Sequence, residues 1–432
     1  MRTVLKRSMS QATVDPTAYV AVLALGYACA LLAGQIWTDV EVLPGLTPSE
    51  IVVWLSVVTG LLLWLRCRVW SRSALVRAFL GVVLVLWVLT MTLELVRGPV
   101  PERASLSLGL ALALMIAKPP GPEAALRAMT VLAWAICGLA AASIALEALG
   151  VAWAWSSTAD AFGLGDFERD SYWLPISDVL GIHGRWAGPF LHPNRAGPVA
   201  AVLLVFGLRR AGTSGWVFAL TGLVMLALTA SRASEIAALA GVVTMIVAQL
   251  FLRERRQEAF PRGLAALVFA GVVVLLMAPV VLPPGSGTAV GPRAYLASAA
   301  SGMGRTTIWP EYVRLGEQSP WTGIGAGGIF DAIAKGALPA WAIHAHNTFL
   351  DVAARHGVVA LLLLIGLLTS ALIVTVGSCR RGLPLGLALL AVVVVNSMGH
   401  TVMSFVFPEF PLWVLLLAVM MSVPDGGTHD DG

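Results

Sequence analysis

The sequence predicts an all-α integral membrane protein with about 12 transmembrane helices, each of roughly 17–25 residues. The composition carries this prediction, because 58% of the 432 residues are apolar and only 12% are charged. Water-soluble domains are roughly half apolar and about a quarter charged. A soluble fold of this length could not cover its surface with so few charges. Much of the apolar surface must therefore face lipid.

The apolar residues form continuous segments that are long enough to cross a bilayer as helices. The segments lie at residues 17–37, 49–65, 76–96, 104–117, 124–149, 187–208, 215–231, 235–252, 263–283, 358–377, 382–400 and 402–422. The segment at 104–117 is short, and Pro193 and Pro198 interrupt the one at 187–208. We expect one polytopic membrane domain over residues 1–432. We expect no disulfide, because no cysteine lies in an expected outer loop.

The positions of Lys and Arg predict how these helices are oriented. If the N-terminus is inside, every second loop is basic and the short loops between them contain almost no Lys or Arg, as the positive-inside rule describes. The basic loops lie at residues 2–7, 66–77, 118–127, 209–210, 253–262 and 380–381. We therefore expect cytoplasmic termini and a first apolar segment that is retained, because it lacks a cleavage pattern. Since the basic residues are spread over short loops, the net charge of +4 does not indicate nucleic acid binding.

Two of the expected outer segments are long, at residues 151–186 and 284–357. Long loops are usually either functional or disordered. The second segment contains aromatic and helix-forming stretches, so we expect it to be folded. Six of the seven histidines lie on this outer side or at its membrane boundary, namely His183, His192, His344, His346, His356 and His400. The polar chemistry is therefore concentrated on one face of the membrane.

His346 and Asn347 stand at the end of the second outer segment, where an apolar helix is expected to re-enter the bilayer. An imidazole titrates near working pH, so His346 is suited to take a proton from a hydroxyl as a general base. Alternatively, the histidine caps the helix or anchors it at the headgroups. A metal site of His344, His346 and His356 is a third interpretation, but its spacing matches no common zinc pattern.

Arg305 precedes a short amphipathic stretch that is followed by a glycine-rich turn. Gly323, Gly325, Gly327 and Gly328 in this turn could let backbone N–H groups approach a phosphate. An ordinary flexible turn is the competing interpretation, because the glycine pattern by itself is not specific.

Arg232 lies in a very short outer turn between two apolar helices, against the inward bias of the other arginines. An ionised Arg costs about 2.5–3.5 kcal/mol at full depth in the bilayer, so some interaction should compensate for this position. A lipid diphosphate would do so, since a guanidinium binds phosphate bidentately. A snorkelling anchor is the alternative. Arg185 and Asn194 lie at the entry of the proline-interrupted segment, where polar residues either line a cavity or satisfy freed backbone groups.

Together these motifs resemble the O-antigen ligase and Wzy-type polymerase family of membrane glycosyltransferases. The residues that carry the resemblance are Ser231–Arg232, Gly304–Arg305, Trp309, the turn 322–325 and, above all, His346–Asn347. In the family pattern His is followed by Asn or Ser, then by nine intervening residues and a glycine, and a second glycine stands three positions after the first. Gly357 fits the first position, whereas Ala360 replaces the second glycine. The stretch 184–197 is similar to a further family element, and the resemblance extends over about residues 184–400.

The resemblance implies a transferase of GT-C-like architecture in the bacterial inner membrane, with its active site facing the periplasm. The donor would be a glycan on undecaprenyl diphosphate, and the acceptor a hydroxyl of lipid A–core or of another glycan. Membrane lipids are the other expected partners, and neither a metal nor a cofactor is expected. His346 would be the general base of a one-step, inverting displacement. The substrate-binding residues would be Arg305, Arg232, Arg185, Asn347 and Asn194.

Two alternatives to an O-antigen ligase stand beside this interpretation. A Wzy-type polysaccharide polymerase shares the donor chemistry and differs only in the acceptor. A transporter or flippase for a lipid-linked glycan belongs to another class, and it should bury ionisable residues within several helices. The expected helices are nearly free of charge, which favours the enzyme. The sequence does not identify the group that orients His346, for which Asp331, Asp351 and Glu409 are candidates.

Overall fold

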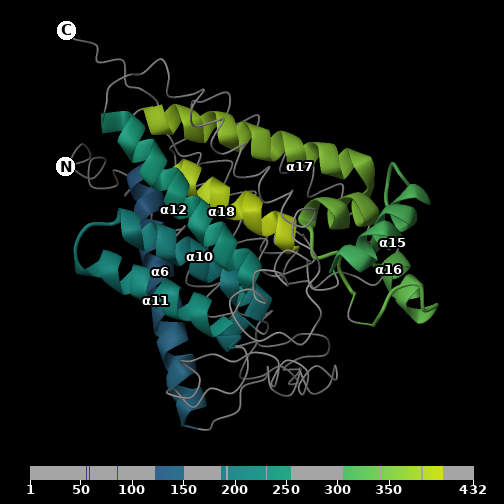
Figure 1. Cartoon of the computed structure of the whole chain (residues 1–432), viewed down its shortest axis with the longest axis horizontal. Helices are drawn as coiled ribbons and strands as arrows, with labels where there is room; N and C mark the ends of the chain where they lie inside the picture. The colour runs from purple at the N-terminus through teal and green to yellow at the C-terminus, as the bar shows by residue number, and fades with distance from the viewer. Residues whose placement is uncertain are drawn as a thin grey trace, which may run out of the picture.

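The computed structural model describes residues 122–149, 186–190, 193–229, 231–253, 305–340, 342–380 and 383–401, together with the single positions 55, 58 and 85. Within these ranges the regular structure is helical and includes no strand, in agreement with the expected all-α class (Figure 1). The elements are α6 (Pro122–Ala148), the 3₁₀ helix η1 (Gly188–Phe190), α10 (Pro193–Arg209), α11 (Thr213–Thr229), α12 (Arg232–Arg253), α15 (Arg305–Glu317), α16 (Gly325–Ala334), α17 (Thr348–Arg380) and α18 (Leu385–Gly399).

Three of the described helices are long and apolar enough to cross a membrane. The qualifying stretches are Met129–Leu146 in α6, Arg232–Leu250 in α12 and Thr348–Cys379 in α17. Three shorter apolar helices, α11, α16 and α18, accompany them among the described residues. This part of the chain therefore fits a membrane protein.

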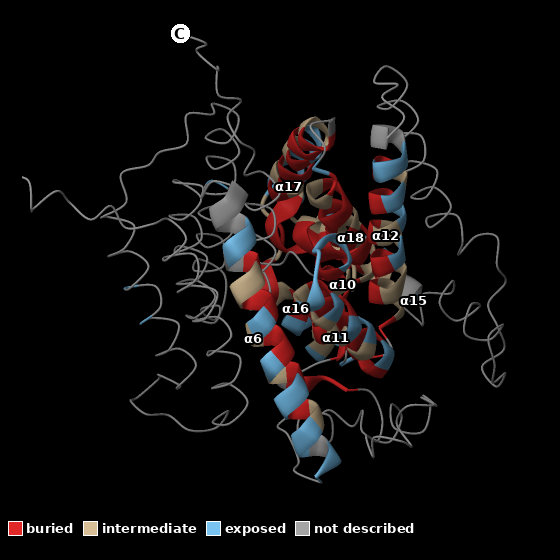
Figure 2. Ribbon diagram, turned by 90° about the vertical axis from the view of Figure 1, so that its left-hand side faces the viewer, coloured by how far each residue is buried: buried red, intermediate tan, exposed pale blue. Residues whose placement is uncertain are grey.

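Apolar side chains cover the outward faces of these helices as well as the inward ones. In α12 the residues Leu239, Val243, Ile246 and Leu250 recur at helical spacing along one face, and all four are exposed. Figure 2 shows such exposed faces on α6 and α12, while α10 and α18 are largely buried. An exposed apolar stripe of this kind is what a lipid-facing helix presents.

The described helices correspond to six of the segments that the sequence predicts to span the membrane. Two of them differ in where they begin. The segment predicted at 187–208 forms η1 first, and α10 begins only at Pro193, where the fixed φ of proline suits the first helical turn. The segment predicted at 358–377 is preceded by a further helical stretch, so α17 begins at Thr348. The predicted segments at 17–37, 49–65, 76–96, 104–117, 263–283 and 402–422 lie outside the described ranges.

Two hydrogen bonds between distant segments establish which helix ends lie together. Arg210, which follows α10, donates from Nη1 to Thr130 Oγ1 near the start of α6 at 2.7 Å. Trp186 donates from Nε1 to Ser143 Oγ near the end of α6 at 3.0 Å. The connection between α10 and α11 therefore lies at one end of α6, and Trp186 lies at the other. This grouping is the one that the predicted orientation requires.

Helix α17 consists of two helical pieces that meet at Gly357. Gly357 has φ 81° and ψ 177°, a conformation that is essentially restricted to glycine. An added Cβ there would lie 2.2 Å from the carbonyl oxygen of Trp321, because the chain around 320–324 packs backbone to backbone against the break. Val358 N–H donates to the carbonyl of Pro320 at 2.7 Å, and Ile324 N–H donates to that of Ala354 at 2.9 Å. The family pattern that includes Gly357 thus has a local physical cause.

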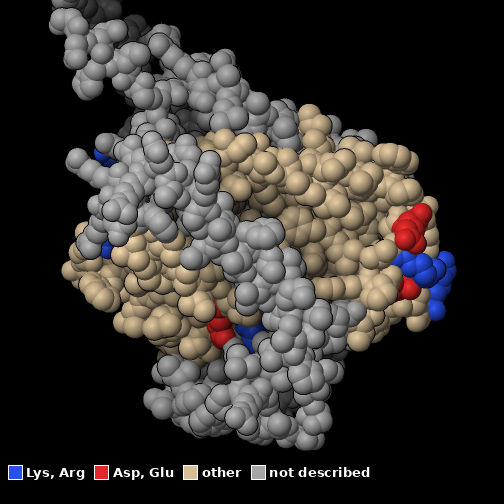
Figure 3. Space-filling view, turned by 45° about the horizontal axis from the view of Figure 1, so that its top comes forward, with Lys and Arg blue, Asp and Glu red and all other residues tan. Residues whose placement is uncertain are grey.

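Residues 305–340 and 342–356, called the outer module below, form a small folded unit beside the long part of α17 (Figure 1). The unit has a hydrophobic core of its own, made of Ile308, Tyr312, Leu315, Ile329, Ala332, Leu338, Ala342, Ala345 and Ala354. In Figure 3, acidic and basic side chains gather on the side where α15 and α16 lie in Figure 1. Among them, Arg314 and Glu311 form an ion pair on the surface of α15. The hydrogen bond from Arg314 holds the pKa of the Glu311 carboxyl below its usual value.

The break at Gly357 predicts a strong dependence on glycine at this position. Gly357→Ala should lower the free energy of unfolding by about 1–3 kcal/mol, since alanine is strained in this conformation, and the clash with Trp321 should add to the loss. Gly366→Ala is the matched control, because nothing lies within 4 Å of a Cβ added in that part of α17. Thermal unfolding of the purified protein in detergent measures both. Equal midpoints for the two variants would contradict the account of the break.

Candidate active site

The loop before α17 carries His346, and two aromatic side chains of α15 hold its backbone in place. Trp309 donates from Nε1 to the carbonyl of Ala345 at 3.0 Å. The hydroxyl of Tyr312, which is fully buried, donates to the carbonyl of Ala342 at 2.9 Å. Burial raises the pKa of the Tyr312 hydroxyl, which keeps it protonated and able to donate. The sequence Trp309–Tyr312 thus places two donors one helical turn apart, facing the loop.

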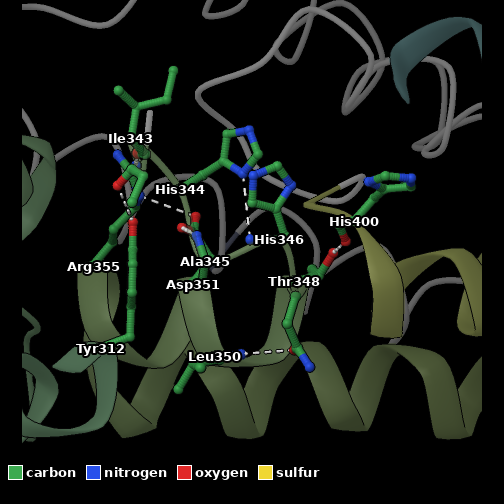
Figure 4. Close-up of polar contacts among 12 residues, drawn as sticks. Tyr312, Ile343, His344, Ala345, His346, Thr348, Leu350, Asp351, Arg355 and His400 are labelled. Atoms are coloured by element: carbon green, nitrogen blue, oxygen red, sulfur yellow. Dashed lines mark hydrogen bonds and ion pairs between the residues drawn. The ribbon is translucent and has the colours of Figure 1, made fainter. Parts of the chain in front are cut away.

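A buried ion pair holds the same loop from its other side (Figure 4). Asp351 and Arg355 lie one turn apart in the first piece of α17, with Arg355 Nε 3.0 Å from Asp351 Oδ2. Their side chains are only 1% and 3% exposed. Asp351 also accepts the N–H of Ala345 at 3.0 Å, and Arg355 donates to the carbonyl of Ile343. The pair therefore satisfies its own buried charges by fixing loop groups on both sides of His344.

His346 has a left-handed backbone conformation, with φ 51°. This conformation is uncommon for a residue other than glycine, and strained residues of this kind cluster at functional sites. The N–H of His346 donates to His344 Nδ1 at 3.3 Å, and the two ring centroids are 4.0 Å apart. The ring of His346 is half-buried and lies 6.4 Å, between centroids, from the ring of His400. The surrounding loop thus imposes the geometry of this histidine.

Asn347 caps the start of α17. Its Oδ1 accepts the N–H of Leu350 at 3.1 Å, and its carbonyl accepts the N–H of Asp351 at 2.9 Å. Asparagine is among the residues that cap helix N-termini most effectively. The alternative interpretation gave the capping role to His346, but Asn347 caps the helix instead. The substrate contact expected of Asn347 stays a prediction.

His400 connects the ends of three helices at this site. The residue follows α18, and its ring Nε2 lies 3.2 Å from Ser231 Oγ at the start of α12. Its carbonyl accepts a hydrogen bond from Thr348 Oγ1 in the first turn of α17 at 2.9 Å. Ser231 continues into a buried polar chain, described further below, that reaches Asn396 of α18. Polar groups buried among apolar helices need such partners.

Two glycines allow the helices to approach closely around this polar junction. An added Cβ on Gly197 of α10 would lie 2.6 Å from both Ser231 Cβ and Ser234 Oγ. An added Cβ on Gly399 would lie 2.6 Å from the Cβ of Ala233 in α12. Small residues at helix crossings permit this kind of approach in membrane proteins. The ends of α10, α12 and α18 and the start of α17 are therefore packed around one point.

The predicted site residues are located as follows. His346 and Arg232 belong to one region, because the ring of His346 neighbours His400, which contacts Ser231 next to Arg232. Arg232 is the first residue of α12, and its Nε is buried. Asn194 is half-buried in the first turn of α10. Arg305 is the first residue of α15, but its side chain lies outside the described part, as does all of Arg185.

The glycine-rich turn has a structural role that the sequence left open. The N–H of Gly323 donates to the carbonyl of Ser319 at 2.7 Å, and that of Ile324 donates to the carbonyl of Ala354. A Cβ on Gly323 would lie 2.1 Å from the carbonyl carbon of Arg355. These two N–H groups are therefore engaged within the protein and do not form a phosphate cradle. The glycine serves the close packing of the turn against the break in α17.

The histidines in the described part of the chain form no group that suits a metal ion. Among the described residues, no three His, Cys, Asp or Glu side chains are gathered as ligands. His344 and His346 are neighbours, whereas His356 is buried at the end of the first piece of α17. The three-histidine metal interpretation therefore has no support in this part of the chain.

Several residues that shape the site were not singled out by the sequence. Asp351 was a candidate to orient His346, and it acts on the loop backbone at Ala345 instead. Asp331 is exposed on α16, and Glu409 lies outside the described part. No role was assigned from the sequence to Tyr312, Arg355, Ser234 and Asn396, and His400 was placed only among the histidines of the outer side. Their only sequence signal is local spacing: Asp351–Arg355 and Asn396–His400 are four residues apart, and Ser231–Ser234 are three apart.

The buried ion pair yields a prediction about stability. Asp351→Ala leaves the buried guanidinium of Arg355 without its carboxylate, so the free energy of unfolding should fall by about 3–5 kcal/mol. Replacing both residues by apolar ones, in Asp351→Leu/Arg355→Met, should recover part of this loss. Glu311→Ala, which removes the surface partner of Arg314, is the control and should change little. Thermal unfolding measures the midpoints of these variants. Equal midpoints for Asp351→Ala and Glu311→Ala would contradict the role of the pair.

Comparison with known proteins gives one family. Residues 217–365 match the model of the O-antigen ligase family, a stretch that runs from α11 to the long part of α17. The match includes Ser231–Arg232, Arg305, the turn at 322–325 and His346–Asn347, which carried the resemblance. A comparison with curated proteins found no match. Residues 217–365 thus carry the O-antigen ligase family domain, and the resemblance inferred from the sequence is confirmed over them.

Proposed function

We propose that this protein is an O-antigen ligase-type glycosyltransferase. It moves a glycan from undecaprenyl diphosphate to a hydroxyl of lipid A–core. The reaction takes place on the periplasmic face of the inner membrane. The family match supports a ligase- or polymerase-type activity, and the choice of donor and acceptor is our own inference from the resemblance.

The observation that supports this proposal most is the setting of His346. The loop that carries the residue is tied down by Trp309, Tyr312 and the buried Asp351–Arg355 pair. The residue is held in a left-handed conformation beside the start of α12, where Arg232 lies. A strained, half-buried histidine just before a long apolar helix is typical of an active site rather than of a helix cap.

In the proposed mechanism His346 acts as a general base. It accepts the proton of the acceptor hydroxyl while the hydroxyl oxygen attacks the anomeric carbon of the donor sugar. The bond from that carbon to the diphosphate oxygen breaks in the same step, and undecaprenyl diphosphate leaves with its electron pair. Because attack and departure occur on opposite sides, the anomeric configuration is inverted.

The diphosphate that leaves gains negative charge, and arginines are suited to stabilise it. We assign this role to Arg305 and Arg232, which begin α15 and α12. A guanidinium offers a planar pair of donors to phosphate oxygens, and such donors stabilise charge that develops in the transition state. Two guanidiniums supply the charge that a divalent cation provides in other enzymes, so the proposed reaction is metal-independent. Arg185, Asn194 and Asn347 would make further contacts with the diphosphate or the glycan.

The ligase and the Wzy-type polymerase share this donor chemistry. They differ only in the acceptor, which is lipid A–core for the first and another lipid-linked glycan for the second. We propose the ligase because the family whose model matches is described as O-antigen ligase.

The assignment of the base predicts that His346→Ala abolishes transfer while the protein still folds. The rate should fall on the order of 10²- to 10⁴-fold, the usual contribution of a positioned acid or base. The measurement is product formation from undecaprenyl-diphosphate glycan and lipid A–core with purified protein. Lys335→Ala, an exposed substitution in the outer module, is the control and should transfer at the wild-type rate. Near wild-type transfer by His346→Ala would show that the residue is not the base.

A further inference from the structure

A chain of four buried side chains ends at the ring of His400, next to His346. The chain begins at Asn396 in α18 and continues through Ser234 and Ser231 of α12. It reaches His400 Nε2, which lies 3.2 Å from Ser231 Oγ. All four side chains are at most 3% exposed. A chain of this length among apolar helices is unusual because each member must be satisfied by another.

The direction of every hydrogen bond in this chain follows from its first member. Asn396 donates from Nδ2 to the carbonyl of Val392 at 3.1 Å, which only an NH₂ group can do. Its Oδ1 is therefore the acceptor for the Ser234 hydroxyl at 3.0 Å. Since Ser234 has used its hydrogen, it accepts from Ser231 across 2.9 Å. Ser231 has then used its own hydrogen and accepts from His400, so Nε2 of His400 carries a hydrogen.

The fixed hydrogen on Nε2 determines what the rest of the ring offers. In the neutral imidazole one nitrogen is a donor and the other an acceptor, so Nδ1 of His400 holds the lone pair. Along the hydrogen bonds of the described residues, the chain ends at the carbonyl of Val392, which is neither acidic nor basic. It therefore does not conduct protons away. What it does is hold one ring in one tautomer and one orientation.

This ring is a close neighbour of the proposed base. The centroids of His346 and His400 are 6.4 Å apart, with 58° between the ring planes. Figure 4 shows the two rings beside one another above the start of α17. The separation exceeds direct ring contact and suits one bridging water. The hydrogen bond from Thr348 to the carbonyl of His400 keeps the loop that carries His346 against this ring.

We propose that His400 is the residue that positions His346 and stabilises the imidazolium formed there, an inference that rests on the proposed function. One ring nitrogen of His346 takes the proton of the acceptor hydroxyl, while the N–H on its other nitrogen donates through one water to the lone pair on Nδ1 of His400. His400 itself neither gains nor loses a proton in this step. The polar chain through Ser231, Ser234 and Asn396 keeps the hydrogen on Nε2 and therefore the lone pair on Nδ1. A histidine whose partner fixes its tautomer is a known requirement of general-base catalysis.

The kinetic test compares variants of His400 and Ser231 in the transfer assay. His400→Ala should lower kcat on the order of 10²-fold, at the low end of what a positioned acid or base contributes. The KM for the donor should not change, because His400 acts only as the transition state forms. Ser231→Ala should also lower kcat, since the ring is then free to change tautomer. His400→Gln should recover part of kcat, because its amide can keep the hydrogen bond to Ser231.

A matched control separates this role from a loss of stability. Ser143→Ala breaks a buried hydrogen bond to Trp186 in α6, away from the chain that ends at His400. It should lower the thermal midpoint as the His400 variants do, yet keep the wild-type kcat. Loss of transfer in His346→Ala with wild-type kcat in His400→Ala and Ser231→Ala would overturn the positioning role and leave the proposed function standing. Wild-type transfer in His346→Ala would overturn both.

The tautomer can be measured without any activity. In protein labelled with ¹⁵N-histidine, the His400 signals, identified by their loss in His400→Gln, should be those of a ring protonated at Nε2. Asn396→Leu removes the group that sets the direction of the chain, and it should shift these signals toward a mixture of tautomers. Signals of a ring protonated only at Nδ1 in the wild-type protein would overturn the inference.

Discussion

The buried pair of Asp351 and Arg355 is the interaction on which the rest of the site depends. Besides pairing with each other, both side chains form hydrogen bonds with the backbone of the loop before α17. Two buried charges in an apolar setting are stable only when their lone pairs and protons are satisfied in this way. The pair consequently fixes the loop on both sides of His344, and His346 follows directly in a left-handed conformation. The conformational free energy that the left-handed backbone of His346 costs is offset by these contacts of the loop, which do not involve the His346 ring.

A second polar centre, the junction at His400, joins this loop to the membrane helices. The outer module folds around its own core, and the long helices pack through another. Apolar contacts between the outer module and the long helices do not fix their relative orientation. The hydrogen bonds of His400 with Ser231 and with the Thr348 hydroxyl depend on orientation and do fix it. These buried polar groups therefore lie where the loop must be aligned with the helices. The loop that carries His346 is thereby attached to the start of α12 and the end of α18 through His400.

The sequence predicts the helical class and many helix bounds, because hydrophobic length is a local property. The segment predicted at 235–252, for example, lies within α12. The sequence also indicates His346 and Arg232, since a polar residue at the end of an apolar helix is conspicuous. It does not reveal the break in α17, which depends on Gly357 meeting the backbone of Trp321 far along the chain. Nor does it reveal His400 as part of the site, because 169 residues separate it from Ser231. Tertiary contacts of this kind leave no periodic pattern.

In the proposed mechanism an imidazole and two guanidiniums transfer a lipid-linked glycan without a metal ion. The most direct measurement is to incubate the purified protein with undecaprenyl-diphosphate glycan and lipid A–core in excess EDTA. The metal-independent mechanism predicts a single glycan transfer to the lipid, with release of undecaprenyl diphosphate. Absence of transfer until Mg²⁺ or Zn²⁺ is added would contradict it.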